Sequence, residues 1–428
     1  MDTIFALSSA QGRAGVAVIR ISGSLAHDAI QRLTKRLPAP RRATLRLIYG
    51  ADQQVIDQAI VLIFNEKQSF TGEEVAEIQC HGSLAVTRAL LSTLASFPGL
   101  RAAEPGEFTR RALENGCLDL SQVEGLADLI EAETEAQRRQ SFRIMTGDLT
   151  ARVEEWRSAL IRAIALLEVT IDFADEDVPE TVTPDVRQLT QGVVSQLRRQ
   201  VEGFSTAERV RNGFEVAIVG APNVGKSTLL NALAGRDAAL TSSVAGTTRD
   251  VIEVRMDLRG IPVTLLDTAG LRETDDEVER LGISRARERA QAADLRVFLV
   301  SPEEQPSFEP ENDDIILISK ADLTGLTDNA ISGVTGQGLD RLMDRIISVF
   351  EDRIASAGLA VRERHRIAME DAILSIAASQ QMLDDDLPDP ELASENLRVA
   401  IRSLDSITGR FDIENVLDEI FTSFCLGK

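Results

Sequence analysis

The segment from Gly220 to Ser227 constrains the fold of this chain more than any other feature. It reads GAPNVGKS, which fits the pattern G-x-x-x-x-G-K-[ST], and it directly follows the apolar run Phe214 to Val219. In such a loop the glycines let backbone N–H groups converge on a phosphate, and the amino end of the next helix adds a favourable dipole. The segment therefore predicts a strand, a phosphate-binding loop and a helix over Thr228 to Ala234, as in α/β nucleotide-binding domains.

The residue types in this loop match the chemistry of a bound triphosphate. Lys226 is expected to reach the β- and γ-phosphates, and the hydroxyl of Ser227 is expected to ligate Mg²⁺. The predicted nucleotide contacts of the loop are Asn223, Val224, Gly225, Lys226, Ser227 and Thr228.

Three later motifs, in the order typical of GTP-binding domains, indicate that the nucleotide is GTP. Thr248 is placed to complete the coordination of Mg²⁺, and Asp267 ends an apolar strand where it can hold the metal through water. Asp322 follows the apolar run Ile315 to Ile318 and can accept hydrogen bonds from guanine N1 and N2, which adenine cannot supply. The predicted GTP contacts of these motifs and of the later base loop are Ser242, Ser243, Val244, Ala245, Gly246, Thr247, Thr248, Asp267, Thr268, Ala269, Gly270, Ser319, Lys320, Ala321, Asp322, Ser332 and Gly333.

Two positions on the guanine side depart from the usual motifs. Ser319 stands where Asn is usual, which predicts a weaker tether between the base and the phosphate loop. Ser332-Gly333 stands where Ser-Ala is usual, but the backbone N–H that would bind guanine O6 is retained. Both departures bear on affinity more than on the choice of base.

The water-orienting group for hydrolysis stays open at the level of these motifs. Many small GTPases place Gln after the glycine of the D-x-x-G motif, whereas Leu271 occupies that place here and cannot orient water. Glu273, Glu277 and Glu279 all follow, and each is equally explained as part of a solvated acidic loop.

The chain has 428 residues, which is more than a single compact core usually contains. It divides into four segments of different sequence pattern. Residues 1–117 mix short strands with glycine turns and predict an α+β domain; Val75 to His81 alternates, with Glu77 on its polar face. Residues 118–211 and 352–428 have apolar side chains at helical spacing. Residues 212–351 alternate strands and helices. We therefore predict a Ras-like P-loop GTPase domain inserted between the two halves of a helical domain.

Charge and cysteine content limit the environment and the partners. The net charge of −22 argues against direct, non-specific binding to nucleic acid, so a local patch or a more basic partner must supply the attraction. The three cysteines form no CxxC pair, which fits a reducing compartment. No basic leader precedes an apolar run and no stretch is long enough to span a bilayer, which predicts a cytoplasmic protein without membrane association.

The chain resembles the family of tRNA-modification GTPases called MnmE or TrmE over essentially its whole length. Besides the GTPase motifs, the resemblance rests on GRAG at 12–15, RISG at 20–23, FTGE at 70–73, His81-Gly82, PGEF at 105–108, DLSQ at 119–122 and the terminal CLGK at 425–428. It implies an amino-terminal domain that binds a tetrahydrofolate derivative (the 5-formyl or 5,10-methylene form) and forms a homodimer.

The resemblance also implies roles for individual residues. K⁺ in place of an arginine finger would be held by Asn223, Ser242, Val244 and Thr247, and Glu279 would be the catalytic residue that orients water. The folate contacts carry over to Arg20, Glu77, Cys117 and Lys428, although Cys117 stands where the family commonly has Lys.

The activity that the resemblance implies is modification of the wobble uridine of tRNA at C5. A heterotetramer with the FAD-dependent MnmG (GidA) protein would do this with a folate one-carbon unit, and GTP hydrolysis would drive conformational change. Two alternatives stay open: a regulatory or assembly GTPase without modification activity, and a folate-dependent one-carbon transferase regulated by GTP.

Overall fold

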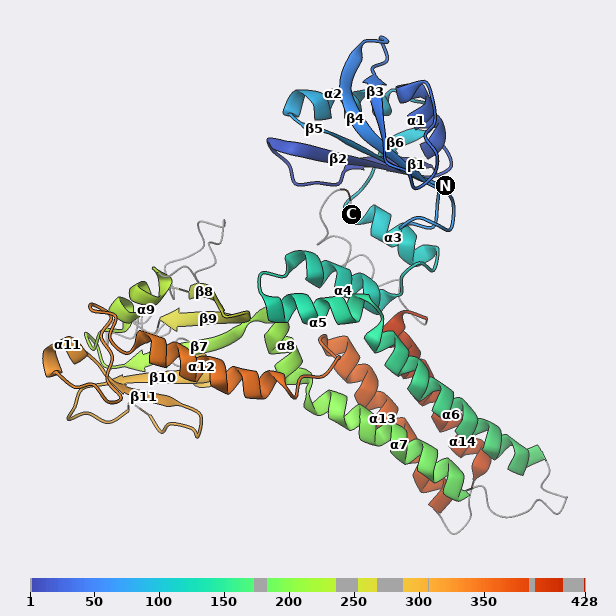
Figure 1. Cartoon of the computed structure of the whole chain (residues 1–428). Coiled ribbons are helices and arrows are strands. Elements are labelled where there is room, and N and C mark those ends of the chain that lie inside the picture. Colours follow the sequence, from blue (N-terminus) through green and yellow to red (C-terminus); the bar gives the residue numbers. More distant parts are fainter. Residues whose placement is uncertain are drawn as a thin grey trace, which may run out of the picture. The chain divides into compact units, whose positions relative to one another are not determined.

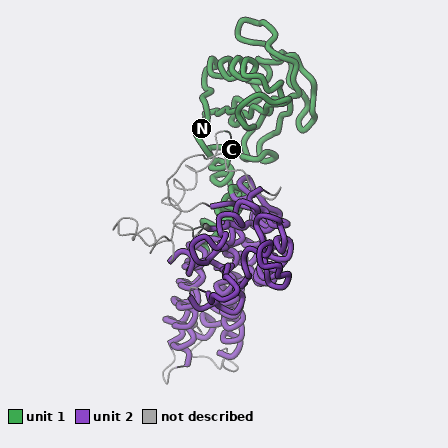
Figure 2. Tube along the Cα trace, turned by 90° about the vertical axis from the view of Figure 1, so that its left-hand side faces the viewer, with its two compact units in different colours: residues 1–127, 405–428 green, residues 128–404 purple. Residues whose placement is uncertain are grey.

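The computed structural model describes residues 2–172, 183–235, 253–267, 288–306, 308–384, 389–410 and 427. The chain forms two compact units, residues 1–127 with 405–428 and residues 128–404, which Figure 2 shows in different colours. Each unit is considered by itself. Within the described residues, no helix is both long and apolar enough to cross a membrane.

The first unit is built on a six-stranded sheet with the strand order β3-β4-β5-β2-β1-β6. All neighbouring strands are antiparallel except β1 and β6, which are parallel. Its elements are β1 (Thr3–Leu7), β2 (Ala14–Ser22), α1 (Ala26–Thr34), β3 (Thr44–Tyr49), β4 (Val55–Phe64), β5 (Val75–Gly82), α2 (Leu84–Ala95), β6 (Leu100–Ala102) and α3 (Glu107–Glu114).

The alternation of buried and more exposed side chains along β5 shows which face of this sheet is covered by helices. Ala76, Ile78 and Cys80 are buried in a core with α1 and α2, because alternate side chains of a strand point to the same face. Glu77 lies on the other face, which the two helices leave open and which α3 covers in part through Phe108. The alternation predicted for Val75 to His81 is therefore confirmed.

The helical part of the second unit contains four long antiparallel helices that lie side by side in Figure 1 (α6, α7, α13 and α14). The indole Nε1 of Trp156 donates to Oε1 of Gln196 at 2.9 Å, which joins α6 to α7. The helices of this part are α5 (Glu135–Met145), α6 (Asp148–Asp172), α7 (Thr183–Glu202), α8 (Phe204–Asn212), α13 (Glu363–Asp384) and α14 (Pro390–Thr408). The boundary between the units falls within α4 (Leu120–Glu131) and near the end of α14.

The rest of the second unit is a five-stranded sheet with the order β11-β10-β7-β9-β8. Its strands are parallel except β8, which pairs with β9 as an antiparallel hairpin. The turn residues Arg259 and Gly260 have φ of 50° and 93°, as a type I′ hairpin turn requires. The elements are β7 (Phe214–Gly220), α9 (Lys226–Ala234), β8 (Glu253–Leu258), β9 (Ile261–Asp267), β10 (Leu295–Val300), β11 (Ile315–Ile318), α11 (Ala321–Thr324) and α12 (Leu339–Ile354).

The predicted fold class is confirmed: a mixed α/β chain with helical regions and a largely parallel sheet that carries the phosphate loop. One boundary differs from its prediction. The helix expected from Thr228 begins at Lys226, because the last residues of the motif already form its first turn.

Candidate nucleotide and folate sites

The phosphate loop runs between the end of β7 and the start of α9. Asn223 and Gly225 have φ of 61° and 114°, so the loop turns through two left-handed residues. A Cβ built on Gly220 would overlap the carbonyl oxygen of Leu299 on β10, so only glycine fits where the loop leaves the sheet. The loop and the helix that follows it therefore take the arrangement that binds phosphate at a helix amino end.

Lys226 directs its ammonium group into this loop. The residue is only 6% exposed. Its Nζ donates to the carbonyl oxygens of Gly220 and Ala221 at 2.8 and 3.0 Å. Phosphate oxygens are stronger acceptors for an ammonium group than neutral carbonyls, because the hydrogen bond then joins two opposite charges. The ammonium group of Lys226 therefore lies where oxygens of a β- or γ-phosphate could take the place of the two carbonyl oxygens as hydrogen-bond acceptors.

The guanine side of the site is formed by two loops whose side chains meet. The hydroxyl of Ser332 donates to Oδ1 of Asp322 at 2.5 Å. The same oxygen of Ser332 accepts from the backbone N–H groups of Val334 and Thr335, each at 3.3 Å. This geometry fixes the carboxylate of Asp322 at the end of β11, in the segment predicted to read the base.

Gly333 has a steric reason to be glycine. A Cβ at this position would lie 2.8 Å from the backbone carbon and oxygen of Thr228 and 2.9 Å from the nitrogen of Leu229, distances that real Cβ atoms do not tolerate. The backbone of the base loop therefore packs directly against the first turns of α9. This contact brings two of the predicted motifs, the phosphate loop and the base loop, to one place.

The remaining predicted nucleotide residues are only partly within the described ranges. Asp267 is the last residue of β9, and its backbone is in register with Ile218 on β7, two residues before the phosphate loop begins. Ser319 is buried, and its N–H donates to the carbonyl of Val300 at 2.9 Å. Lys320 has a φ of 56°. The predictions for residues 242–248 and 268–270, and for Glu273, Glu277 and Glu279, lie outside the described residues.

Arg20 and Glu77, two of the residues implied for folate, are direct partners on the open face of the first sheet. They are opposite each other on β2 and β5, and Nη2 of Arg20 lies 2.9 Å from Oε1 of Glu77. The guanidinium carbon of Arg20 is also 5.5 Å from the ring centre of Phe70 and 5.7 Å from that of Phe108. The single charge in the apolar strand β2 is thus neutralised, and the pair is bordered by two aromatic rings.

A buried polar network that we did not predict supports this face. Nη1 of Arg111 donates to both carboxylate oxygens of Glu73 at 3.1 Å, and Nη2 donates to Glu107 at 3.0 Å. Glu73 also accepts from the hydroxyl of Ser22 at 2.6 Å. The network joins β2, the loop after β4 and α3, so it holds Phe70 and Phe108 beside Arg20. Arg111 had no sequence signal beyond its place one helical turn after Glu107.

The charges in this network perturb one another. Burial acts to raise the pKa of Glu107, but hydrogen bonds from Arg101, from the backbone of Glu104 and from Arg111 outweigh it and lower the pKa below its ordinary value. Glu107 is therefore held ionised between the exposed Arg101 and the buried Arg111.

The other two residues implied for folate are placed less fully. Cys117 is exposed, and its Sγ would lie 2.9 Å from a Cβ built on Gly72, so it borders the loop that carries Phe70. Lys428 lies outside the described residues. Its neighbour Gly427 has a φ of 92°, and a Cβ there would overlap the carbonyl of Leu7 at the end of β1. The chain thus closes against the sheet that carries Arg20.

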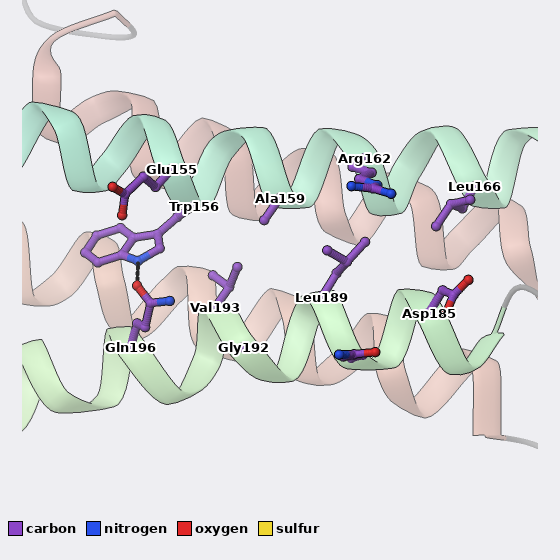
Figure 3. Close-up of a pocket in the computed structure, with 11 residues that line it drawn as sticks. Glu155, Trp156, Ala159, Arg162, Leu166, Asp185, Leu189, Gly192, Val193 and Gln196 are labelled. Atoms are coloured by element: carbon purple, nitrogen blue, oxygen red, sulfur yellow. Dashed lines mark hydrogen bonds between the residues drawn. The ribbon is translucent and has the colours of Figure 1, made fainter.

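A separate groove of about 470 Å³ runs between α6 and α7 (Figure 3). Figure 3 shows Trp156 and Gln196 at one end of the groove and Leu166 and Asp185 at the other. None of the residues predicted to bind GTP, metal or folate lines it. The groove is therefore a feature of helix packing, apart from both candidate sites.

Comparison with known proteins gives matches along the whole chain. The family model described as the MnmE helical domain matches residues 120–425, and the one described as the GTP-binding protein TrmE N-terminus matches residues 3–117. Proteins named tRNA modification GTPase MnmE from Roseobacter denitrificans and Cereibacter sphaeroides are 59% and 57% identical to it, with all of both chains covered.

Two solved structures each match part of the chain. That of Aquifex aeolicus Era bound to GDP and AlF₄⁻ matches with 23% identity and a TM-score of 0.25, over 41% of this chain and 69% of that one. The cytosolic domain of the Thermotoga maritima FeoB iron transporter matches with 21% identity and a TM-score of 0.25, over 48% and 98%.

Proposed function

The chain belongs to the MnmE (TrmE) family of tRNA modification GTPases, and from this we propose that it modifies the wobble uridine of tRNA at C5 together with a flavoprotein partner. GTP and Mg²⁺ belong to the GTPase activity of the family. In our proposal a folate one-carbon unit becomes part of an aminomethyl or carboxymethylaminomethyl group, and hydrolysis of GTP drives the conformational change of the complex.

The arrangement around Arg20 is the observation that carries the proposal. Glu77 presents a carboxylate on an open sheet face, and a carboxylate can accept two parallel hydrogen bonds from the amino-pyrimidine edge of a pterin. Phe70, which is partly exposed, borders the pair with a flat apolar ring suited to a bicyclic ligand, and the buried Phe108 lies beside Arg20 as part of its support. A GTPase that only regulates or assembles other complexes has no need for such a face. Cys117 and Lys428 are proposed to contact the folate tail.

The flavoprotein partner is proposed because this chain supplies no redox group of its own. Its one glycine-rich phosphate motif, at Gly220, is a phosphate loop and not a dinucleotide-binding fingerprint. A formyl-level folate carbon must gain two electrons to become the CH2 of an aminomethyl group, and the reductant has to come from a partner. We therefore propose a heterotetramer with the FAD-dependent MnmG (GidA) protein, with tRNA as the shared substrate in the cytoplasm.

The proposed homodimer has a suitable surface in the first unit. Leu45 and Ile60 face each other across β3 and β4 and are 57% and 39% exposed, and Leu47 lies on the same face. By strand register this is also the face of Glu77 and Arg20. A second copy would bury these side chains, at a gain of about 25 cal/mol per Å² of apolar surface.

For hydrolysis we propose K⁺ as the charge that stabilises the transition state and Glu279 as the group that orients water. A monovalent cation beside the phosphates offsets the negative charge that develops there. Asn223, one of the four proposed K⁺ ligands with Ser242, Val244 and Thr247, is one of the two left-handed residues of the phosphate loop. On this proposal we expect GTP hydrolysis to be faster in K⁺ than in Na⁺.

Nucleoside analysis of tRNA from a deletion strain tests the proposal. We expect loss of the C5-modified wobble uridine, its return with the wild-type chain, and no return with Lys226→Ala or with Arg20→Ala. Full modification in the deletion strain would contradict the proposal and favour a regulatory GTPase. If Arg20→Ala restores the modified uridine, only the proposed folate site is contradicted.

A further inference from the structure

The first unit carries a concentration of positive charge that neither candidate site uses. Residues 31–50 contain six arginines and lysines and no aspartate or glutamate, in a chain whose net charge is −22. Five exposed cations from this stretch and from the loop between β4 and β5 form what we call the basic patch: Lys35, Arg36, Arg41, Arg42 and Lys67.

These five residues lie along the sheet edge where α1 packs beside β3 (Figure 1), in two groups. Lys35 and Arg36 are near Tyr49 at the carboxyl end of β3, and Arg41, Arg42 and Lys67 are near Ile63 and Gln68, beyond its amino end. Lys35 follows the last residue of α1, and its Nζ is 3.6 Å from the ring centre of Tyr49 at the end of β3. The N–H of Arg41 donates to the carbonyl of Ile63 at 2.8 Å, and its Nη1 donates to the carbonyl of Gln68 at 3.2 Å. Arg41 is thereby tied to the loop that carries Lys67.

The backbone of the basic patch is held in an uncommon conformation. Lys35, Arg41 and Lys67 have φ of 61°, 57° and 62°, a region that side chains other than glycine and asparagine rarely enter. Pro38 and Pro40 stiffen the connection between α1 and β3. Lys35 is the left-handed residue that ends α1, a common helix terminus, and Arg41 and Lys67 lie in turns fixed by backbone hydrogen bonds to Ile63 and Gly72. The patch is therefore a preformed surface and not a flexible basic tail.

The charge of the patch is not neutralised within the described part of the chain. None of its five residues forms an ion pair there, whereas several other arginines do. Arg138 and Arg139 both pair with Glu135, and Arg366 pairs with Glu363 and Glu370. An unneutralised cluster on a strongly acidic chain focuses the attraction of a polyanion on one place, because the rest of the surface repels it.

We propose that the basic patch binds phosphates of the tRNA backbone and so positions the substrate on this chain; this inference rests on the proposed function. Arginine and lysine clusters bind phosphate by charge without reading sequence, which suits a shared contact to several tRNAs. A membrane surface fits less well, because peripheral helices insert apolar side chains beside their cations. Here the exposed Leu45 and Leu47 lie on the face of the sheet away from α1, whereas Lys35 and Arg36 directly follow α1.

The test is the affinity of the full chain for an unmodified tRNA transcript, measured by fluorescence anisotropy across a salt series with and without the flavoprotein. The double variant Arg36→Gln/Arg42→Gln removes two cations of the patch. The matched control Arg88→Gln/Arg198→Gln removes two exposed arginines outside it, with the same change of net charge. Equal thermal unfolding of all three proteins establishes that the patch variant is folded.

We expect the patch variant to bind tRNA about tenfold more weakly at low salt. The slope of the logarithm of the binding constant against the logarithm of the salt concentration should be smaller in magnitude by about two, one for each lost phosphate contact. The control should bind as the wild type does. Equal affinity of patch variant and control would overturn the inference and leave the proposed function intact. Loss of binding to vesicles of phosphatidylserine, with tRNA binding unchanged, would assign the patch to a membrane instead. A wild type that binds no tRNA with or without the flavoprotein would contradict the proposed function as well.

Discussion

The hydroxyl of Ser332 donates a hydrogen bond of 2.5 Å to Oδ1 of Asp322, so the second base loop orients the residue that reads guanine. Ser332 is 1% exposed and is fixed in turn by two backbone N–H groups. A carboxylate that is aligned before the nucleotide arrives loses less entropy on binding. Specificity for the base therefore depends on two loops.

Ser332→Ala is expected to weaken GTP and GDP binding without changing the choice of base. The variant removes one hydrogen bond to a charged acceptor, worth about 1.5–3 kcal/mol, which corresponds to roughly a tenfold to hundredfold loss of affinity. Equilibrium titration with a fluorescent GDP analogue measures the loss. Thr335→Ala, which keeps the Ser332 hydroxyl, is the control and should bind normally. Equal affinity of Ser332→Ala and wild type would show that the bond does not orient Asp322.

Arg20→Ala is expected to reduce the affinity for a tetrahydrofolate derivative by at least about tenfold, because Glu77 loses its charged partner. Isothermal titration of the full chain with 5-formyltetrahydrofolate measures the affinity. Arg20→Lys keeps the charge but not the planar group beside Phe70 and Phe108, so it should recover only part of the loss. If Arg20→Ala binds 5-formyltetrahydrofolate with the affinity of the wild type, the pair of Arg20 and Glu77 is not part of the folate site. Arg88→Ala, on the helical side of the sheet, is the control.

Acid is expected to destabilise the first unit because it protonates Glu107, which forms an ion pair with Arg111. The pKa of Glu107 is lower in the folded chain than in the unfolded one, so its ionised form adds stability that is complete above about pH 4.3. That contribution is lost as the pH falls through the folded pKa.

Thermal unfolding followed between pH 7 and pH 3 is expected to show a smaller acid dependence in Glu107→Gln than in the wild type. Glu66→Gln, in which an exposed glutamate is replaced, is the control and should keep the wild-type slope. An unchanged slope in Glu107→Gln would mean that the network does not contribute to stability against acid.

Glu279→Ala is expected to leave GTP binding nearly intact and to remove most turnover, since water would no longer be oriented for attack. Single-turnover hydrolysis separates the chemical step from product release. Glu273→Ala and Glu277→Ala, the two other acidic candidates in the segment, should hydrolyse GTP at a rate close to that of the wild type. If one of these two variants loses GTP hydrolysis while Glu279→Ala remains active, the assignment of Glu279 as the water-orienting residue is wrong.

The GTPase part of the fold could be predicted from the sequence because its signals are local. The run Phe214 to Val219 and the glycines after it specify a strand and a phosphate loop without reference to distant residues. The same holds for the alternation along β5. Even here the first turn of α9 was placed two residues late, since the motif residues Lys226 and Ser227 belong to the helix.

Contacts between residues far apart in sequence could not be predicted. Arg111 meets Glu73, 38 residues away, only because α3 folds onto the open face of the sheet. The pairing of Arg20 with Glu77 depends on the register between β2 and β5. The need for glycine at 333 arises from a backbone contact with Thr228 that no local pattern encodes. The division into segments 1–117, 118–211, 212–351 and 352–428 stays a prediction.

The most direct test of the central claim is the nucleotide preference of the wild type and of Asp322→Asn. A carboxylate at this position accepts from guanine N1 and N2, whereas an amide can donate to the second carbonyl of xanthine. The wild type should hydrolyse GTP and neither ATP nor XTP, and Asp322→Asn should lose GTP and gain XTP. Hydrolysis of ATP by the wild type, or undiminished use of GTP by Asp322→Asn, would contradict the account.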